Sequence, residues 1–497
     1  MNQAILNVVP KTARCILEVG CANGELGAQV IQSRGCEYWG IELDESASAA
    51  AKQRLTHVLN GDIEALDLSL LPLDHFDCLI FGDTLEHLVN PESVLVRLKP
   101  HLKIGAHLIA SVPNIGHWTV VLELLHGEFE YGDSGLLDRT HRRFFTPASL
   151  RKALWRCGFT VKGEGRTLLG STECDAIVRA ASDLGVGTEI AARGLSTYQV
   201  LAFAEMQPDL DRQPEKRELL LRSRVPLSDA VVGKLSVVIV TFQSESTIEE
   251  CLLSVLGSLT ESDEVIVVDN DSSDGTCEKI EDIRREWPQI QLRRMKSNLG
   301  YARAANTGVH ISSGEYIVLA NPDVTFVGDW KEAFVEVLEL PGCGAVGPIS
   351  DRVMGRQSFA ARYDHEASAQ ESAEFCAQFY REVEETAMLI GFCIALKRET
   401  LSECGLLDEA LYLGADDLEL SWRLRTLGLK LFIALDVFVE HRHGVSFSAI
   451  AASTAESQVR ASDLQLRHKL SDYYGGIQGL SSVLIWDHPV FDAVLLA

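Results

Sequence analysis

The stretch CILEVGCANGELGAQVI, residues 15–31, decides the fold of the first half of the chain. It starts as an apolar strand, passes through a glycine-rich turn and continues as a helix. Glycines at positions 20, 24 and 27 allow the backbone to turn sharply and to come close to a ligand. Their spacing is not the G-x-G-x-x-G of dinucleotide sites, which disfavours a dehydrogenase.

Acidic residues lie at or just after the ends of the next predicted strands of this half. Glu42, in YWGIELDE, lies about 20 residues after the turn, where a carboxylate accepts hydrogen bonds from both ribose hydroxyls. Asp62, in NGDIEAL, is placed to contact an adenine amino group. Asp83 follows the strand FDCLIFG, and Glu86 and His87 lie in the same strand-end crevice. A glycine turn alone is equally compatible with a plain tight connection, but three elements in register predict a nucleoside site.

Residues 12–204 resemble the class I S-adenosylmethionine-dependent methyltransferases on these motifs. Glu18 and Gly20 match the first motif, and Ala22 stands where many members carry a second glycine. The resemblance implies a Rossmann-like sheet that binds S-adenosyl-L-methionine, with Glu86 and His87 near its methionine moiety. The cofactor-binding residues it implies are Glu18, Gly20, Gly24, Glu42, Asp62 and Asp83.

The segment SVPNIGHWTVVLELLHGEFEYGDSGLLDRTHRRFFT, residues 111–146, resembles the substrate-side segment of methyltransferases from bacterial polysaccharide and small-molecule pathways. Methyl transfer from a sulfonium needs in-line positioning and removal of the acceptor hydroxyl proton. A histidine, with an ordinary pKa of about 6.5, suits that removal. His141 and His117 are therefore the candidate catalytic bases, with structural histidines as the equally weighted alternative.

The second half repeats the alternation of strands and helices with different motifs. The stretch LSVVIVTFQSESTIEECLLSVL, residues 235–256, begins as a continuous apolar strand that ends near Thr241, as expected for a strand buried on both faces. The next strand ends in EVIVVDNDSSDGT and places Asp269 and Asp271 at a carboxyl end, where open α/β sheets bind ligands. A carboxylate there can accept a hydrogen bond from the imide N–H of uracil or thymine.

Three further acidic positions suggest transfer chemistry. A buried strand ends in Asn321-Pro322-Asp323, and a divalent cation held there can neutralise a departing diphosphate. In LDEALYLGADDLELSWRLRTLG, one of the paired Asp416 and Asp417 can take the proton of an acceptor hydroxyl, although two acids before a helix also suit capping. In VFVEHRHGVSF, His441 or His443 is placed to complete the metal shell.

Residues 235–447 resemble glycosyltransferase family 2, the inverting enzymes with the GT-A fold, and most closely its rhamnosyltransferase-like bacterial members. The resemblance implies Asp417 as the catalytic base and Asp323 and His441 as ligands of Mg²⁺ or Mn²⁺. Asn321 departs from the family's usual Asp-x-Asp, although its carbonyl is still a hard oxygen ligand. The nucleotide-sugar-binding residues predicted here are Thr241, Asp269, Asp271, Arg303, Asn306 and Asn321.

Length and composition indicate how many domains the chain has and which partners it disfavours. The 497 residues exceed the size of one hydrophobic core, roughly 250–300 residues, so two α/β domains are expected. The predicted organisation is a methyltransferase at 1–205, a charged linker at 206–234, a glycosyltransferase at 235–450 and a helical extension at 451–497.

A net charge of −26 disfavours nucleic acid as a partner. The 12 cysteines show no metal-ligand spacing and no apolar run is long enough to span a bilayer, which predicts a cytoplasmic chain, free or at the inner face of the membrane.

These features predict a bifunctional enzyme of bacterial surface glycan synthesis, acting on O-antigen, capsule or another polysaccharide. It would transfer a sugar from a UDP- or dTDP-type donor to a glycan acceptor, lipid-linked or free, with inversion, and would O-methylate a glycan hydroxyl. The alternative is that only one half is catalytic and the other is a module that binds the glycan or a partner.

Overall fold

The computed structural model describes residues 2–183, 188–207, 214–221, 224, 226–363, 368–442 and 452–476. The chain divides into two compact units, unit 1 with residues 1–212 and 474–479, and unit 2 with residues 213–473 and 480–497. The division falls inside the segment that the sequence predicts as a linker. In the described part of the chain, no helix is long and apolar enough to cross a membrane.

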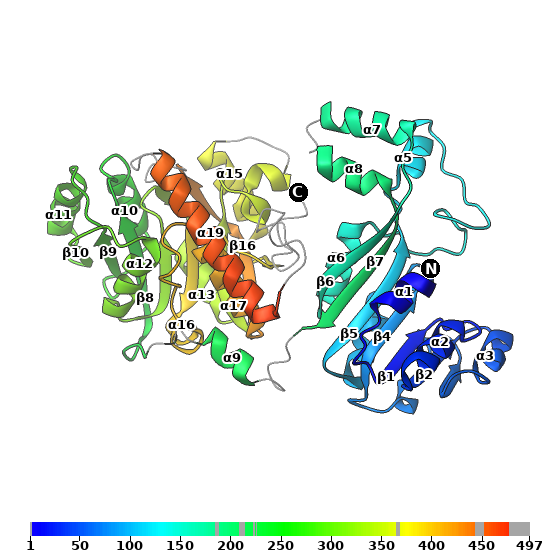
Figure 1. The fold of residues 1–497 in the computed structure, drawn as a ribbon. Coiled ribbons are helices and arrows are strands. Elements are labelled where there is room, and N and C mark those ends of the chain that lie inside the picture. Colours follow the sequence, from blue (N-terminus) through cyan, green and yellow to red (C-terminus); the bar gives the residue numbers. More distant parts are fainter. Residues whose placement is uncertain are drawn as a thin grey trace. The chain divides into compact units, whose positions relative to one another are not determined.

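Unit 1 is built on a seven-stranded sheet with the order β3-β2-β1-β4-β5-β7-β6 (Figure 1). Neighbouring strands are parallel except that β7 runs antiparallel to both β5 and β6. The order reverses between β1 and β4, which is where open α/β sheets bind ligands. The strands are β1 (Cys15–Val19), β2 (Glu37–Glu42), β3 (His57–Asn60), β4 (Phe76–Gly82), β5 (Leu102–Pro113), β6 (Phe159–Leu168) and β7 (Thr197–Met206).

Helices cover both faces of this sheet, and two separate apolar clusters fill the layers between them. The helices are α1 (Asn2–Val8), α2 (Glu25–Arg34), α3 (Glu45–Ala51), α4 (Pro91–Leu98), α5 (Trp118–Leu125), α6 (Pro147–Arg156), α7 (Thr172–Asp183) and α8 (Thr188–Ser196). Short 3₁₀ turns are η1 (Leu68–Leu70), η2 (Leu85–His87) and η3 (Lys99–His101). The helices α5, α7 and α8 share a small cluster of their own, in which Trp118 packs on Val178 and Ala191.

Unit 2 contains a nine-stranded mixed sheet with the order β10-β9-β8-β11-β15-β13-β16-β12, and β14 pairs with β16. The strands β8 to β11 are parallel, and β15 runs antiparallel between β11 and β13. The strands are β8 (Val231–Thr241), β9 (Glu264–Asp269), β10 (Ile290–Arg294), β11 (Gly314–Ala320), β12 (Val324–Val327), β13 (Cys343–Ile349), β14 (Val383–Thr386), β15 (Cys393–Lys397) and β16 (Lys430–His441).

The central strands of unit 2 are buried on both faces, which explains their continuous apolar sequence. Alternate residues of β8 enter opposite clusters, since Val237 and Ile239 pack on one face and Val238 and Val240 on the other. The helices are α9 (Pro214–Leu220), α10 (Ile248–Leu256), α11 (Thr276–Glu286), α12 (Tyr301–Ile311), α13 (Trp330–Leu338), α14 (Phe359–Tyr363), α15 (Ala369–Cys376), α16 (Arg398–Cys404), α17 (Asp416–Thr426) and α19 (Ala452–Tyr474). The α/β class predicted for both halves is confirmed.

Candidate functional sites

The glycine turn of unit 1 lies after the carboxyl end of β1, and its backbone is held in a left-handed conformation. Gly20, Ala22 and Gly24 have φ of 76°, 47° and 78°. The Gly20 N–H donates to the Ile41 carbonyl over 2.8 Å. A Cβ at Gly20 would lie 2.4 Å from Thr84 Oγ1, so a side chain there would clash and be strained. The turn therefore places backbone atoms, and not side chains, at the point where the strand order reverses.

Glu42 connects this turn to the end of β2. Its carboxylate accepts a hydrogen bond from the Ala22 N–H over 2.7 Å and another from the Asp44 N–H over 2.9 Å. Each oxygen keeps a further lone pair, so the group is both positioned and able to accept from a ligand hydroxyl. Ala22 thus adopts the left-handed conformation of the turn, and its N–H positions Glu42, the predicted ribose-binding acid.

Two other predicted cofactor residues lie in contrasting surroundings. Glu18 is buried inside β1 and accepts a hydrogen bond from the Tyr38 hydroxyl over 2.9 Å. Burial raises the pKa of Glu18 to about 7, although the Tyr38 bond opposes this rise. Asp62 is exposed and accepts from the Glu64 N–H over 2.9 Å. Glu18 therefore supports the sheet from within, whereas Asp62 is open to a ligand.

Asp83 follows β4 in the left-handed region, with φ of 55°. It accepts a hydrogen bond from Gln199 Nε2 over 2.6 Å, and Gln199 also donates to Ser111 Oγ over 3.1 Å. Burial raises the pKa of Asp83, and the Ser111 and Gln199 bonds oppose that rise. Gln199 comes from β7, more than 100 residues away in sequence, so no local motif indicates it.

The two candidate bases of unit 1 differ in what their rings contact. His117 is 1% exposed, with Nδ1 2.9 Å from Thr119 Oγ1 and Nε2 3.0 Å from the Leu169 carbonyl. Both ring nitrogens are therefore engaged, and this geometry does not support a role for His117 as a base. His141 is half-buried, its ring centroid lies 5.0 Å from that of His87, and burial lowers its pKa. The structure thus brings His141, but not His117, to the residues that follow β4.

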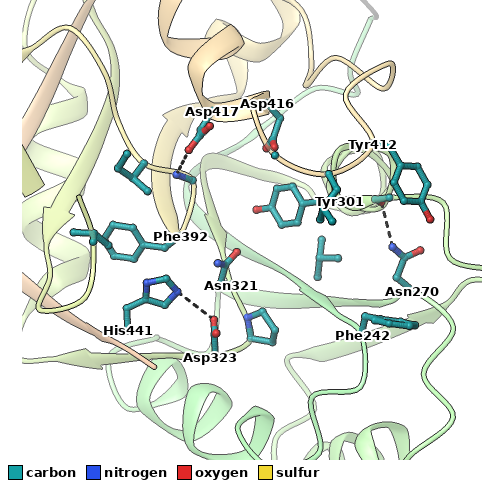
Figure 2. Close-up of a pocket in the computed structure, with 18 of the residues that line it drawn as sticks. Phe242, Asn270, Tyr301, Asn321, Asp323, Phe392, Tyr412, Asp416, Asp417 and His441 are labelled. Atoms are coloured by element: carbon teal, nitrogen blue, oxygen red, sulfur yellow. Dashed lines mark hydrogen bonds and ion pairs between the residues drawn. The ribbon is translucent and has the colours of Figure 1, made fainter. Parts of the chain in front are cut away.

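Unit 2 contains a cavity of about 810 Å³ at the carboxyl ends of β8, β9 and β11 (Figure 2). Four predicted residues line it, namely Asn321, Asp323, Asp417 and His441. Its other lining residues are Val240, Phe242, Asn270, Asn298, Gly300, Tyr301, Pro322, Arg352, Val353, Met354, Ile390, Gly391, Phe392, Tyr412, Leu413, Gly414 and Asp416.

Two carboxyl groups at the start of α17 form one wall of this cavity. Asp417 Oδ2 accepts from the Gly391 N–H over 2.9 Å (Figure 2), and its Oδ1 accepts from the Leu418 N–H over 2.8 Å. Burial raises the pKa of Asp416 to about 7, and the neighbouring Asp417 adds to the rise. Burial also raises the pKa of Asp417. The N-cap residue is Ala415, so neither acid caps the helix.

Asp323 and His441 form a second wall, as Figure 2 shows. Both are 5% exposed, and Asp323 Oδ1 lies 3.5 Å from His441 Nε2. Asp323 Oδ1 is buried without a hydrogen bond, and the His441 ring stacks on Phe392 at 5.2 Å. A buried carboxylate oxygen beside an imidazole, with the amide of Asn321 nearby, is a donor set that fits Mg²⁺ or Mn²⁺.

The predicted base-binding acids lie outside the cavity lining. Asp269 Oδ1 accepts from Thr241 Oγ1 over 3.1 Å, so these two residues connect the ends of β8 and β9. Asp271 is exposed, with φ of 74°. Asn270, between the two acids, lines the cavity and donates to Asn298 Oδ1 over 2.9 Å. Successive residues of a strand face opposite sides, so the alternation in EVIVVDND could have indicated Asn270.

Arg303 and Asn306 also lie outside the cavity lining and instead hold the segment that leads to α17. Arg303 Nε donates to Glu409 Oε2 over 2.8 Å, and Asn306 Nδ2 donates to the Leu407 carbonyl over 2.9 Å. Their geometry supports a positioning role. Arg352, which sequence reasoning missed, is the only arginine or lysine among the described lining residues.

Two family models match the chain. Residues 236–405 match glycosyl transferase family 2, and residues 2–134 match the methionine biosynthesis protein MetW. Unit 2 therefore carries a family 2 glycosyltransferase domain, and unit 1 carries a methyltransferase-like domain. Both resemblances predicted from the sequence are confirmed, and both indicate a transferase.

Curated relatives match parts of the chain. An uncharacterized glycosyltransferase of Haemophilus influenzae is 30% identical over 105 residues, 21% of this chain and 32% of that protein. The poly-beta-1,6-N-acetyl-D-glucosamine synthase of Staphylococcus epidermidis is 27% identical over 138 residues, 28% of this chain and 32% of that protein. The ubiquinone biosynthesis O-methyltransferase of Acinetobacter baumannii is 20% identical over 155 residues, 30% of this chain and 64% of that protein. The chain spans less than two thirds of each of these relatives.

Solved structures are similar to each unit separately. The mannosyltransferase PcManGT from Pyrobaculum calidifontis, in complex with GDP-Man and Mn²⁺, has a TM-score of 0.37 at 20% identity, covering 57% of this chain and 80% of its own. A SAM dependent methyltransferase from Archaeoglobus fulgidus has a TM-score of 0.30 at 17% identity, covering 41% of this chain and 94% of its own.

Proposed function

We propose, from the premise that unit 2 is a family 2 glycosyltransferase domain, that the chain is a bifunctional enzyme of bacterial surface glycan synthesis. Unit 2 transfers a sugar from a nucleoside diphosphate to a glycan hydroxyl with inversion, and unit 1 O-methylates a glycan hydroxyl. The observation that carries the proposal is one cavity with Asp417 on one wall and the Asp323–His441 pair on another. A polysaccharide synthase among the relatives supports a glycan as the product.

Asp417 is the proposed base of sugar transfer. Its carboxylate is fixed by the Gly391 and Leu418 N–H groups, so little reorganisation is needed when it accepts the acceptor hydroxyl proton. The hydroxyl oxygen then attacks the anomeric carbon opposite the diphosphate, which inverts the configuration. A raised pKa suits the task, because proton transfer is most effective when the base titrates near the working pH.

The leaving diphosphate requires positive charge at the other wall. Asp323, His441 and the Asn321 carbonyl would hold Mg²⁺ or Mn²⁺, which when bound supplies charge neutralisation. Arg352 lines the same cavity and adds a cationic side chain for the diphosphate oxygens. Asn270 and Asn298 build the wall next to Phe242, where we place the uracil or thymine base.

Unit 1 has the parts for binding S-adenosyl-L-methionine. The backbone of residues 20–24, the positioned Glu42 and the exposed Asp62 fit its nucleoside, and Asp83 fits the methionine end. S-adenosyl-L-methionine supplies the methyl group as a sulfonium. The chain's own residues orient the acceptor hydroxyl and promote the loss of its proton, a task that we assign to the surroundings of His141.

The test of both activities is transfer of radiolabelled methyl and of sugar by the full chain. UDP-, GDP- and dTDP-sugars are each supplied with manganese, magnesium or chelator, and lipid-linked and free glycans serve as acceptors. Transfer of both groups to one glycan supports the proposal. Transfer of one group alone supports the alternative in which the other unit is a binding module, and transfer of neither refutes the proposal.

Asp323→Ala should lower metal-stimulated sugar transfer by about 10²-fold or more, because the cation loses a buried carboxylate and the diphosphate loses its counter-charge. The rate is measured across a manganese titration. Asp329→Ala is the matched control, since Asp329 is an exposed acid outside the cavity lining. Equal metal dependence in wild type and Asp323→Ala would contradict the assignment.

Glu42→Gln should weaken binding of S-adenosylhomocysteine by about 10–100-fold, because hydrogen bonds to a charged acceptor contribute about 1.5–3 kcal/mol. Calorimetric titration measures the change in Kd. Glu45→Gln is the control, since Glu45 is exposed in the first turn of α3. Unchanged affinity in Glu42→Gln would show that the ribose lies elsewhere.

A further inference from the structure

A cluster of Glu86, His87 and His141 lies beside the proposed methyl-donor site of unit 1. One potential ligand atom from each residue lies within 4.8 Å of the other two. Glu86 and His87 belong to η2, directly after β4, whereas His141 comes from the loop between α5 and α6. The cluster thus joins two segments about 50 residues apart at the carboxyl edge of the sheet.

Backbone hydrogen bonds hold the two segments together. The Arg142 and Arg143 N–H groups donate to the Glu86 carbonyl over 2.7 and 3.0 Å. The Arg143 guanidinium donates from Nε to the Val89 carbonyl over 2.8 Å. The contacts of Arg142 and Arg143, and not the His141 ring, therefore hold this loop against η2.

The hydrogen bonds of the two imidazoles determine which nitrogen is available. His87 Nδ1 lies 3.3 Å from the Thr140 carbonyl, and His141 Nδ1 lies 3.2 Å from the Leu136 carbonyl. A carbonyl only accepts, so Nδ1 carries the proton in both rings and Nε2 is left with its lone pair. Metal-binding histidines in proteins characteristically donate their second ring N–H to a carbonyl or carboxylate in this manner.

Glu86 provides an independent observation. It is 1% exposed, and its Oε2 is buried without any hydrogen-bond partner. Burial raises the pKa of Glu86 to about 8, with the nearby Asp83 carboxylate adding to the rise. An unpartnered buried carboxylate oxygen is costly, and a bound cation would satisfy it.

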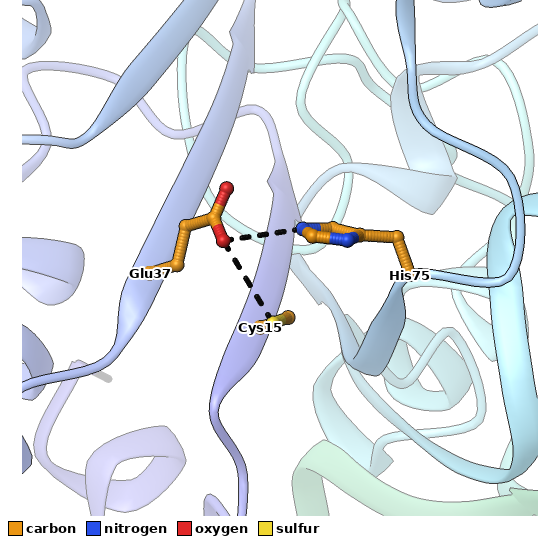
Figure 3. A group of neighbouring side chains, drawn as sticks. All are labelled: Cys15, Glu37 and His75. Atoms are coloured by element: carbon orange, nitrogen blue, oxygen red, sulfur yellow. Dashed lines mark hydrogen bonds and ion pairs between the residues drawn. The ribbon is translucent and has the colours of Figure 1, made fainter.

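A second group of possible ligands consists of Cys15, Glu37 and His75 (Figure 3). These residues lie at the amino ends of β1, β2 and β4, whereas the first cluster lies at the carboxyl end of β4. The central carboxylate of the second group is already used, because Trp39 Nε1 donates to Glu37 Oε1 over 2.7 Å and His75 Nε2 lies 3.2 Å from Glu37 Oε2. This group has no unpartnered carboxylate oxygen, and it serves as the comparison for the first.

We propose that Glu86, His87 and His141 bind a divalent first-row transition metal ion, such as Zn²⁺, Mn²⁺ or Fe²⁺, at the methyl-acceptor side of unit 1. Two imidazole nitrogens and one carboxylate oxygen are the ligands these ions favour, and three protein ligands leave a position for an oxygen of another molecule. Ligand atoms around one ion lie roughly 3.4 Å apart for bonds of about 2.1 Å, so small side-chain rotations close the site.

The role of this site rests on the proposed function of unit 1. The open position would take the acceptor hydroxyl and lower its pKa. As the oxygen forms its bond to the methyl carbon, the carbon–sulfur bond breaks, its electron pair passes to sulfur, and the hydroxyl proton is released to water. In this role His141 is a ligand, and the cation performs the activation that the sequence assigned to a histidine base.

The experiment uses the full chain carrying Asp323→Ala, which removes the proposed cation pair of unit 2. Zn²⁺ is titrated by calorimetry, and Co²⁺ is titrated with the visible spectrum as a direct reading of its ligands. Glu86→Gln and His141→Ala are compared with His75→Ala as the matched control, and His87→Ala replaces any variant that fails to fold. Circular dichroism and urea unfolding verify the fold of each protein.

We expect one equivalent of metal in the parent and in His75→Ala, and affinity at least 10-fold lower in Glu86→Gln and His141→Ala. No binding in the parent, or loss in His75→Ala with retention in Glu86→Gln, overturns the site. Methyl transfer is assayed separately with and without chelator. Metal binding at this site without methyl transfer to any glycan refutes the proposed function and leaves the site standing. Chelator-resistant methyl transfer by a metal-free chain supports the proposed function of unit 1 and refutes the role of the metal in it.

Discussion

Asp417→Asn should lower the rate of sugar transfer by about 10²–10⁴-fold, the contribution typical of a positioned general base. Asparagine keeps the size of the side chain and can still accept the Gly391 N–H through its carbonyl, but it cannot take a proton. Donor binding should therefore change little while kcat falls. The measurement is steady-state sugar transfer, with donor affinity determined separately by calorimetry.

Asp416→Asn is the matched control for this variant, because it removes the adjacent carboxyl from the same cavity wall. Activity should persist in Asp416→Asn. Burial raises the pKa of Asp417, so wild-type activity should fall on the acid side at a higher pH than an ordinary aspartate would give, because the base becomes protonated there. The repulsion between the two acids raises the pKa of Asp416, whereas burial raises the pKa of Asp417, so Asp416→Asn should keep the acid limb of the wild type. Loss of activity in Asp416→Asn with retention in Asp417→Asn would reverse the assignment.

Arg423→Met should lower the unfolding free energy of unit 2 by about 3–5 kcal/mol, the cost of leaving a buried charge without its partner. Arg423 and Glu419 are fully buried in α17, with Arg423 Nη2 2.9 Å from Glu419 Oε2. The guanidinium also donates to the carbonyls of Gly405 and Leu406 over 2.9 and 2.8 Å. Lys469 on α19 lies 2.8 Å from Glu419 but cannot replace these bonds.

The control is Arg460→Met, which breaks a Glu–Arg pair of the same i,i+4 spacing on the surface of α19. Both side chains of that pair are largely exposed, so stability should hardly change. Urea unfolding of the full chain is the measurement, and only the transition of unit 2 should move in Arg423→Met. Equal shifts in the two variants would show that burial does not set the strength of the α17 pair.

The buried pair also links stability to the site, since α17 carries Asp416 and Asp417 at its first turn. Arg303 and Asn306 hold residues 407–409 just before that turn. The resemblance to glycosyltransferase family 2 implied that these two residues lie near the donor. Sequence reasoning did not indicate their contacts with Leu407 and Glu409, because these partners lie about 100 residues further along the chain.

Local patterns were sufficient for the parts of this protein that depend on neighbours in sequence. The apolar runs predicted buried strands, and the glycine turn at residues 20–24 predicted the strand-to-helix connection. Such signals are readable because backbone conformation and the burial of a strand are encoded within a few residues. The grouping of Asp323, His441 and Asp417 was implied by the resemblance to glycosyltransferase family 2 and not by a local pattern.

Tertiary structure alone decided which of the candidate side chains share a site. In the folded chain both ring nitrogens of His117 have hydrogen-bond partners, and Asp269 contacts Thr241 while Asn270 lines the cavity. His141 lies beside Glu86 and His87. A side chain's partners across a sheet edge or a long loop depend on strand order and register, which a single residue's type and spacing do not encode. Which carboxyls are buried, and hence which titrate near neutral pH, follows from the same packing.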